Sequence, residues 1–315
     1  MKKSIFIQRL FDAAIGNRKL PIPKSGAIAS KLFFRIKDRI KNHIIDYPIG
    51  ENKLSLPVYH GLPWYFKASP LYSKNLPRIA GYLENKYTDF TVIDIGANIG
   101  DSAYLLRERL ANTDILCVEG NPEYLPLLEI NVGKIKRATI AKKFVGKENT
   151  VVKGILVSDG GGTTFTKETG EGDTLAFDSL NNIVNESGIN RNIRMVKIDT
   201  DGYDCEIIKD NLAFLNSCKP VLFFEYAPAW FPKGTEQHAD FFETLSANRY
   251  NHFIFYDGNG NYLSCCDRTD LDYASKQVHF YLTYKGFGDI AAWHDDDVDL
   301  YNYSLDMEKK FYLKK

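Results

Sequence analysis

Short apolar runs alternate with helical repeats from residue 91 to residue 226. Most of the runs are about four or five residues long, a length typical of strands that are buried on both faces of a parallel sheet. Strands are expected at 91–95, 114–118, 138–145, 195–198 and 221–224. Because helical patterns separate these strands, the alternation predicts an α/β fold with an open parallel sheet.

Two further strand patterns follow the parallel strands. A helix is expected at 235–247, and strands are expected at 252–256 and 278–282. Residues 257–260 read Asp-Gly-Asn-Gly, a turn signal directly after the first of these two strands. Five parallel strands with a hairpin-like end indicate a seven-stranded mixed sheet rather than an all-parallel dinucleotide-binding fold.

The segments on either side of the alternating region are organised differently. We expect a basic N-terminal helical extension over 1–50, short strands and a lead-in helix over 51–90, the α/β domain over 91–290, and a C-terminal tail over 291–315. Pro21-Ile22-Pro23 separates two helical patterns within the first segment. An inserted hairpin with glycine-rich loops is expected within residues 146–190.

Charge is distributed unevenly along the chain. The 315 residues include 40 Lys and Arg and 40 Asp and Glu, but residues 1–41 hold eleven basic residues and two Asp, a net charge of +9 that leaves −9 on the remainder. The same segment has apolar stripes that include Phe6, Phe11, Phe33 and Phe34. It could dock on the acidic body or on a second subunit, which we favour, or make peripheral contact with an anionic membrane.

Membrane and redox signals are weak. No apolar run reaches the length of a transmembrane segment, and no signal-peptide pattern is present. The five cysteines show no Cys-x-x-Cys spacing, which favours reduced thiols. We therefore expect a cytoplasmic location, at the inner face of the membrane if the basic segment binds lipid.

The turn after the first parallel strand is rich in glycine and indicates a nucleotide-like ligand. Residues 94–101 read Asp-Ile-Gly-Ala-Asn-Ile-Gly-Asp, between a buried strand and a helix. A dinucleotide motif would have its second glycine where Asn98 stands, and the carboxylate of Asp94 would repel a pyrophosphate. A ligand with a cationic amino group, such as S-adenosylmethionine, suits Asp94 better. The candidate contacts in this turn are Asp94, Gly96, Ala97, Asn98, Gly100 and Asp101.

Glu119 ends the second parallel strand, 25 residues after Asp94. An acidic side chain in this position can accept two hydrogen bonds from the hydroxyls of a ribose. Glu119 and the following Gly120 therefore join the candidate cofactor contacts. A nicotinamide-dependent sugar oxidoreductase is the alternative enzyme class, which the glycine spacing and Asp94 disfavour.

A third motif stands at the end of the fourth parallel strand. Residues 197–204 read Lys-Ile-Asp-Thr-Asp-Gly-Tyr-Asp. This segment resembles the FkbM family of S-adenosylmethionine-dependent methyltransferases, whose usual pattern is Lys-Ile-Asp-x-Glu-Gly-x-Glu. The resemblance covers roughly residues 90–230. The other shared features are Asp-x-Gly-x-Asn-x-Gly at 94–100, the acidic Glu119, the Leu-Asp-x-Leu-like segment 177–180, and Glu225 at the end of the fifth strand.

The resemblance implies a class I methyltransferase fold with a seven-stranded Rossmann-like sheet. It also implies methyl transfer from S-adenosylmethionine to a hydroxyl, often of a sugar in a glycan or a glycosylated natural product. In this type of sheet the end of the third strand borders the base pocket, so the adenine is expected near Phe144, Val145 and Gly146. Two departures from the family pattern are Asp201 and Asp204, which replace glutamates and are shorter by one methylene group.

The catalytic candidates lie at the ends of the fourth and fifth strands. Asp199 and Glu225 are the expected general base or positioning groups, and Tyr226 could orient the substrate. Asp201 and Asp204 have the spacing of an N-cap and an N3 residue, so helix capping is the favoured role for both. Asp199 and Asp201 are weak candidates for binding a divalent metal.

The expected acceptor is a small molecule or a glycan with a free hydroxyl, and no nucleic-acid partner is expected. A homo-oligomer formed through the N-terminal segment is consistent with the charge distribution. The non-enzymatic alternative is a methyltransferase-like scaffold that docks on a membrane through its basic N-terminus. Intact Asp94, Gly96 and Glu119 disfavour a domain that has lost its cofactor site.

Overall fold

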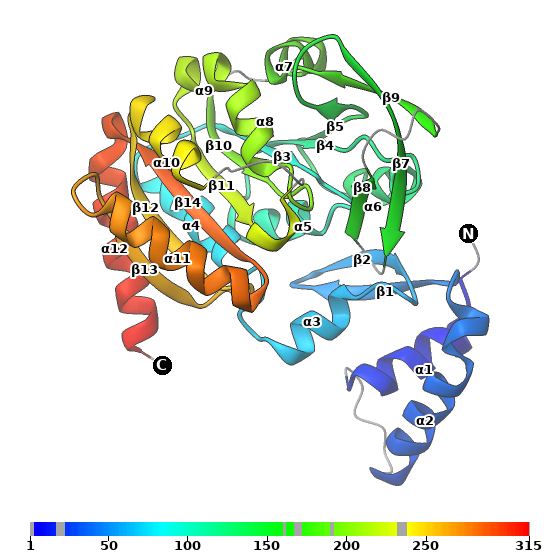
Figure 1. Ribbon diagram of the computed structural model, residues 1–315. Helices are drawn as coiled ribbons and strands as arrows, with labels where there is room; N and C mark the ends of the chain where they lie inside the picture. Colours follow the sequence, from blue (N-terminus) through cyan, green and yellow to red (C-terminus); the bar gives the residue numbers. More distant parts are fainter. Residues whose placement is uncertain are drawn as a thin grey trace. The chain divides into compact units, whose positions relative to one another are not determined.

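The chain forms two compact units (Figure 1). The structure is a computed structural model that describes residues 3–16, 23–159, 162–166, 172–189, 192–231 and 238–314. The first unit consists of Met1–Pro70 with Ser158–Gly162, and the second consists of Leu71–Val157 with Thr163–Lys315. All the candidate site residues belong to the second unit.

An aromatic cluster holds the helices of the first unit together. Its elements are α1 (Ile5–Ile15), α2 (Pro23–Ile40), the antiparallel strands β1 (Ile44–Ile49) and β2 (Asn52–Pro57), and α3 (Leu62–Ala68). The rings of Phe11, Phe33, Phe34 and Trp64 lie 5.5–6.4 Å apart. The two helical patterns expected before residue 45 are confirmed, while residues 17–22 lie outside the described part of the chain. The short strands expected within residues 51–90 end at Pro57. Helix α3 follows from Leu62, and Pro63 fits its first turn.

The second unit is built on one large mixed sheet, one strand wider than the expected seven. Its order is β13 (Tyr262–Cys266), β12 (Tyr250–Tyr256), β14 (Gly288–His294), β11 (Val221–Tyr226), β10 (Ile193–Ile198), β3 (Thr91–Ile95), β4 (Asp114–Val118) and β5 (Ala138–Ala141). The strands from β11 to β5 are mutually parallel, and β14, β12 and β13 pair in antiparallel fashion. The α/β class and the parallel core expected from the hydrophobic pattern are confirmed.

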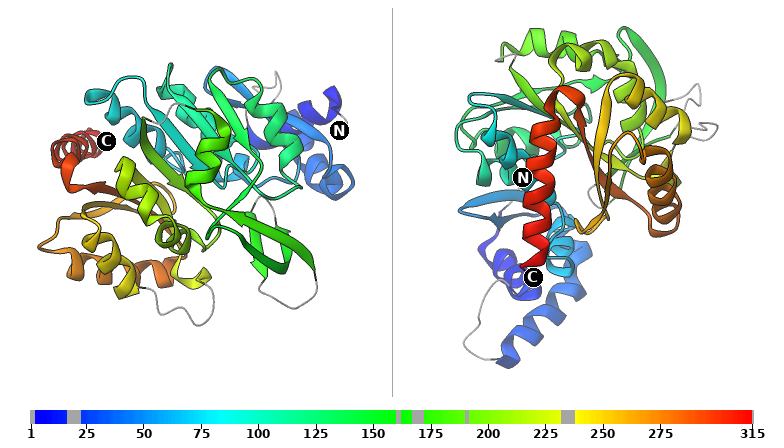
Figure 2. Two further views of the ribbon diagram at one scale, coloured as in Figure 1. Left: turned by 90° about the horizontal axis from the view of Figure 1, so that it is seen from above. Right: turned by 90° about the vertical axis from the view of Figure 1, so that its left-hand side faces the viewer.

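Helices cover both faces of this sheet, as Figure 2 shows for α12 on one side and α10 and α11 on the other. One face packs against α4 (Asn75–Tyr82) with the short 3-10 helix Leu83–Asn85, α5 (Asp101–Arg109), α6 (Leu125–Val132) and α12 (Val298–Leu313). The other face packs against α7 (Leu180–Ser187), α8 (Asp204–Asp210), α9 (Leu212–Cys218), α10 (His238–Ala247) and α11 (Leu271–Lys285). Two further 3-10 helices are Pro228–Trp230 and Asp295–Asp297. Among the helices that the structure describes, none is both long and apolar enough to cross a membrane.

A smaller sheet takes up the end of the expected third strand and includes two adjacent strands, 150–159 and 162–166, in the region where a hairpin is expected. Its order is β6 (Phe144–Val145), β9 (Asp173–Asp178), β7 (Thr150–Asp159) and β8 (Gly162–Thr166). The segment expected as one strand over 138–145 therefore divides between two sheets. Most of the glycine-rich loops expected here, residues 160–161 and 167–171, lie outside the described residues.

The prediction of a strand at 278–282 is wrong, because this segment belongs to helix α11. Val278 and Leu282 are one helical turn apart and are both buried, whereas Phe280 between them is 67% exposed. The alternation of apolar residues therefore reflects one face of a helix. The expected strand position is taken by β14, which pairs with both β11 and β12.

The expected C-terminal tail is in fact packed into the domain. Arg78 on α4 contacts both carboxylate oxygens of Glu308 on α12, at 2.8 and 2.9 Å. The hydroxyl of Tyr82 donates to Glu308 at 2.8 Å and that of Tyr256 donates to it at 3.0 Å. Since the buried carboxylate has a partner for each of its oxygens, Glu308 fixes α12 to α4 and β12.

Candidate functional site

The backbone turns sharply between β3 and α5. Gly96 and Gly100 have φ angles of 71° and 91°, and Asn98 between them has a φ of 48°. A Cβ atom on Gly96 would lie 1.8 Å from the carbonyl oxygen of Asp199, so only glycine fits at this position. The close approach that the glycine spacing predicts therefore joins the ends of two neighbouring strands, β3 and β10.

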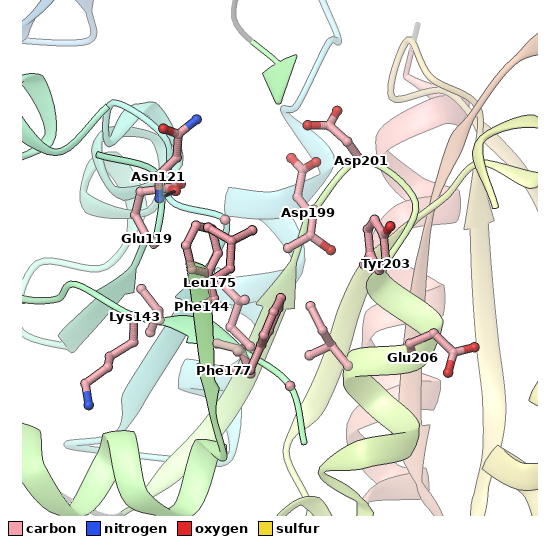
Figure 3. Close-up of a pocket in the computed structure, with 18 of the residues that line it drawn as sticks. Glu119, Asn121, Lys143, Phe144, Leu175, Phe177, Asp199, Asp201, Tyr203 and Glu206 are labelled. Carbon is pink, nitrogen blue, oxygen red and sulfur yellow. Dashed lines mark hydrogen bonds between the residues drawn. The ribbon is translucent and has the colours of Figure 1, made fainter. Parts of the chain in front are cut away.

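A cavity of about 290 Å³ lies at the carboxyl ends of β3, β4 and β10 (Figure 3). Its wall includes the predicted residues Gly96, Asn98, Glu119, Gly120, Phe144, Val145, Gly146, Asp199 and Asp201. The small sheet and the first turns of α8 complete the wall, with Leu175, Phe177 and Tyr203 among the residues that were not predicted as site residues. Open α/β sheets bind ligands at this edge.

The part of the cavity beside the small sheet is apolar. Figure 3 shows Phe144, Leu175 and Phe177 grouped between Glu119 and Tyr203. The rings of Phe144 and Phe177 have centroids 5.7 Å apart. A Cβ atom on Gly120 would lie 2.4 Å from the ring of Phe144, so this glycine leaves room for the ring. A flat apolar group of the size of a nucleobase suits these walls.

Glu119 is oriented by two backbone donors. The N–H of Asn98 donates to Oε2 at 2.9 Å, and the N–H of Asn121 donates to Oε1 at 2.7 Å. Burial raises the pKa of Glu119, and the hydrogen bonds from Asn121 and Asn98 oppose this effect. Each carboxylate oxygen has a further lone pair, so Glu119 can still accept two hydrogen bonds from a diol.

Asp94 does not face the cavity, contrary to the prediction that it meets a cationic amino group. It is fully buried and pairs with the Nζ of Lys197 at 2.9 Å. Asp94 and Lys197 are register partners on β3 and β10, so their side chains lie on the same face of the sheet. Burial raises the pKa of Asp94 and the charge of Lys197 lowers it.

Lys197 opens the motif at 197–204 but was not among the predicted site residues. Its Nζ also lies 3.5 Å from a carboxylate oxygen of Asp199 and donates to the carbonyl oxygen of Gly96 at 3.1 Å. Burial alone would lower the pKa of Lys197, but the charges of Asp94 and Asp199 raise it overall. Two signals in the sequence point to Lys197: its place in this motif and its charge within an apolar strand. Lys197 thus ties the glycine turn to the end of β10.

The other residues predicted in the turn, Ala97, Gly100 and Asp101, do not line the cavity. Ala97 is fully buried in the core under α5. A Cβ atom on Gly100 would lie 3.2 Å from Val132, and Asp101 is the first residue of α5. Burial raises the pKa of Asp101 to about 6. Together with Asp94, these three do not line the cavity, and their assignment as direct cofactor contacts stays a prediction.

The turn after β10 brings Asp199 and Asp201 to the cavity wall. The side chain of Asp199 is 50% exposed, and Asp201 adopts a φ of 51° before Gly202. Asp204 is buried and accepts hydrogen bonds from the backbone and hydroxyl of Thr200, at 3.2 and 2.9 Å. Helix α8 begins at Asp204, so Asp201 is not its N-cap as predicted.

Glu225 and Asp289 lie next to this turn. They are register partners on β11 and β14, and the N–H of Glu225 donates to Asp204 at 3.2 Å. The Oε2 atom of Glu225 is buried and has no hydrogen-bond partner among the described residues. Burial raises the pKa of Glu225 well above its usual value, and the charges of Asp199 and Asp204 raise it further. Asp199 and Glu225, two of the predicted catalytic residues, thus lie close together. Asp289 was not among the predicted residues.

Tyr226 lies in the core instead of at the cavity. It is fully buried, and its hydroxyl is 3.0 Å from Nδ1 of His279 on α11. Its ring contacts Phe231 with centroids 5.3 Å apart. These contacts correct the expectation that Tyr226 orients the substrate, because successive residues of a strand point to opposite faces. Glu225 and Tyr226 therefore cannot both reach the site.

No cluster suited to a metal ion is present in the described part of the chain. Within that part, no three His, Cys, Asp or Glu side chains gather in an arrangement that could hold one. Asp199 and Asp201 do share the cavity wall, but no third His, Cys, Asp or Glu side chain of the described residues gathers with them in an arrangement for a metal ion.

Comparisons with known proteins give one family match. The profile of the family described as "Methyltransferase FkbM domain" matches residues 94–252, about half of the chain. This span contains the glycine turn, Glu119, the turn after β10 and Glu225. A comparison with curated proteins gave no match.

Solved structures of methyltransferases resemble the chain at low sequence identity. The plantazolicin methyltransferase BpumL in complex with SAH is 10% identical, with a TM-score of 0.39, and the match covers 91% of this chain and 97% of that one. The METTL16 MTase domain is 12% identical, with a TM-score of 0.40 and coverage of 88% and 84%. Precorrin-6y C5,15-methyltransferase from Geobacter metallireducens is 16% identical, with a TM-score of 0.37 and coverage of 69% and 87%.

Proposed function

Because the chain belongs to the methyltransferase FkbM domain family, we propose that it transfers the methyl group of S-adenosylmethionine to a hydroxyl oxygen, and that the acceptor is a sugar of a glycan or glycoconjugate. The methyl donor itself follows from the family. The hydroxyl acceptor is supported by the carboxyl groups beside the cavity, above all by the buried and unpartnered Oε2 of Glu225.

The residues of the cavity fit the methyl donor. The apolar wall of Phe144 and Phe177 would hold the adenine, and Glu119 would accept hydrogen bonds from the ribose hydroxyls. The methionine part would then lie toward Gly96 and Asp199, which border the same cavity. When bound, the sulfonium supplies an activated methyl group; the protein supplies alignment and a proton acceptor.

A carboxylate suits the acceptor side of this reaction. An alcohol is a weak nucleophile, and removing its proton as the new bond forms assists the transfer. Glu225 offers an unpartnered oxygen, and its raised pKa makes it a stronger base than an ordinary carboxylate. Asp199 is more exposed and lies 3.5 Å from Lys197, so we assign it to holding the acceptor hydroxyl rather than to taking the proton.

An aromatic pair with one exposed member, next to the site, supports a sugar acceptor. Trp230 is 47% exposed and stacks on Phe287 with ring centroids 5.7 Å apart. A Cβ atom on Gly202 would lie 2.6 Å from the carbonyl oxygen of Trp230, which places this residue beside the turn after β10. Exposed aromatic faces are favourable surfaces for the apolar faces of sugar rings.

Replacing Glu119 by alanine is expected to weaken S-adenosylmethionine binding by about 1–3 kcal/mol, the range for losing hydrogen bonds to a charged group. Isothermal titration calorimetry measures this loss. Glu129→Ala is the matched control, because Glu129 is 51% exposed and pairs with Lys142 on the surface. Tight binding of NAD(H) with no response to S-adenosylmethionine would instead support the oxidoreductase alternative.

The acceptor class can be tested with methyl-labelled S-adenosylmethionine and a panel of sugars. We expect label to enter hydroxyl-bearing saccharides as an alkali-stable methyl ether, with one equivalent of S-adenosylhomocysteine formed. Each active sugar is compared with its analogue lacking the methylated hydroxyl, which should remain unlabelled. Label found only on amines or carboxyl groups would refute the hydroxyl acceptor. Donor binding without transfer to any acceptor would favour the scaffold alternative.

The N-terminal segment enters this proposal as a docking element. Its net charge of +9 over residues 1–41 opposes the charge of the remainder, and Ile5 and Phe6 remain 76% and 61% exposed within the first unit. We propose that these side chains are covered by a second subunit, in a cytoplasmic protein, rather than by lipid.

A further inference from the structure

The strand register places two carboxyl groups side by side under α4. Glu225 and Asp289 are direct partners in the antiparallel pair of β11 and β14, so their side chains lie on the same face. That face is the one packed against α4, because Phe223 and Ala291, two residues away on each strand, belong to its core. Two like charges directly opposite each other are unfavourable in a sheet.

Polar contacts hold one member of this pair and leave the other partly free. The amide of Asn75, the fully buried first residue of α4, donates to Oδ2 of Asp289 at 2.7 Å. The Oδ1 atom of Asn75 accepts the N–H of Leu76 at 3.1 Å, which fixes the orientation of the amide. In the part of the chain that the structure describes, Oε2 of Glu225 has no hydrogen-bond partner. Asp289 is therefore anchored, and Glu225 has an oxygen available.

Among the described residues, no lysine, arginine or histidine forms an ion pair with either carboxyl group, and the charge of Lys197 only partly offsets the burial of Asp289. The ion pairs that these residues form include neither Glu225 nor Asp289, and the buried ammonium of Lys197 contacts Asp94 and Asp199 instead. The other titratable neighbours are mostly acidic: Asp199, Asp201, Asp204 and Asp257, with Tyr72 from the segment before α4. In such surroundings two adjacent carboxylates can both be ionised only at a high cost in free energy.

We propose that Glu225 and Asp289 together form one high-affinity proton site, in which Asp289 is the positioning residue and Glu225 receives the proton of the acceptor hydroxyl. This proposal rests on the proposed function. The reacting form has both carboxyl groups ionised, and their repulsion makes Glu225 strongly basic. As the bond between the acceptor oxygen and the methyl carbon forms, the sulfur–carbon bond breaks with its electron pair on sulfur, and the hydroxyl proton moves to the carboxylate of Glu225. The singly protonated pair then releases this proton to water.

The pair should therefore take up a proton well above the range of ordinary carboxyl groups. Burial raises the pKa of Asp289 to about 7, the hydrogen bond from Asn75 opposes this, and the charge of Asp199 raises it further. Because the folded protein holds a proton that the unfolded chain releases near pH 4, stability should fall as the pH rises from about 4 to about 7.

Asp289→Asn tests the shared proton site without cofactor or acceptor. The asparagine keeps an oxygen for Asn75, so we expect a folded protein in which the urea midpoint falls less between pH 4 and pH 7 than in the wild type. Glu225→Gln should flatten this dependence in the same way. Asp306→Asn is the control, because Asp306 is 56% exposed on α12 and its ion pair with Lys310 is superficial. Unchanged pH dependence in both site variants would refute the proton site.

A pH–rate profile then tests its role in the reaction. With labelled donor and an accepted sugar, the acidic limb for Asp289→Asn should move to lower pH by about one unit, since Glu225 would lose a like-charged neighbour. If Asp289 had a purely structural role, Asp289→Asn would lower the rate at every pH without moving the acidic limb. That result would refute the role of the pair in accepting the proton of the acceptor hydroxyl. If no acceptor is found, the proposed function fails while the stability measurement still decides on the proton site.

Discussion

Lys197→Met is expected to lower the free energy of unfolding by about 3–5 kcal/mol, the range for removing one partner of a buried ion pair. The substitution leaves the carboxylate of Asp94 fully buried without a counter-ion and removes the donor to the carbonyl of Gly96. Urea unfolding followed by circular dichroism measures the loss. Because the glycine turn is tied to β10 through this ammonium, the variant should also bind S-adenosylmethionine more weakly.

Two further variants separate the buried charge from general disruption. Lys276→Met removes a lysine from an exposed ion pair on α11, and it should cost less than about 1 kcal/mol. In the double variant Asp94→Asn with Lys197→Met, no unpaired charge remains at this position, so much of the stability should return. The ion pair would not explain the loss if the two substitutions were additive, that is, if Asp94→Asn lowered the stability of Lys197→Met as much as it lowers that of the wild type.

Glu225→Gln is expected to lower turnover by about 10²-fold or more, the usual scale for losing a general base. Affinity for S-adenosylmethionine should change little, because Glu225 does not line the cavity in which the donor is expected to bind. Steady-state transfer of labelled methyl groups gives turnover, and calorimetry gives the donor affinity. Asp199→Asn should also lower turnover, but it lies in the cavity wall and should change donor binding as well.

Glu243→Gln serves as the control for this series, since Glu243 is an exposed residue of α10 with no contact to the cavity. Near-native turnover of both Glu225→Gln and Asp199→Asn would show that neither residue is the proton acceptor. Another group would then take the proton, or alignment of the reactants alone would account for catalysis. A loss of turnover that parallels a loss of donor affinity in Glu225→Gln would assign it to binding.

Local patterns predicted the fold well, and they singled out Gly96, Asn98 and Glu119, which line one cavity in the structure. The parallel strands follow from short apolar runs, and the positions of Gly96, Asn98 and Glu119 follow from the strand ends that precede them. These features depend on residues that are close in sequence, so the rules of strand, turn and helix apply to them directly. The contact between Asn98 and Glu119 also joins neighbouring strands of one βαβ unit.

Long-range pairing limited the rest of the prediction. Asp94 seemed free to meet a ligand because Lys197, about a hundred residues later in the chain, pairs with it only through the register of β3 and β10. Asp289 escaped notice because β14 was expected ten residues earlier, in what is the helix α11. An alternating apolar segment fits both a strand and one face of a helix, and only tertiary packing decides between them.

The order of the strands also constrains the synthesis of the protein. Strand β14 is the last strand along the chain, yet it lies between β11 and β12 and pairs with both. During translation, β11 and β12 leave the ribosome with their facing edges open and must wait for residues 288–294. Chaperone demand should therefore be greatest in this interval, and a chain released before it would expose two apolar strand edges to aggregation.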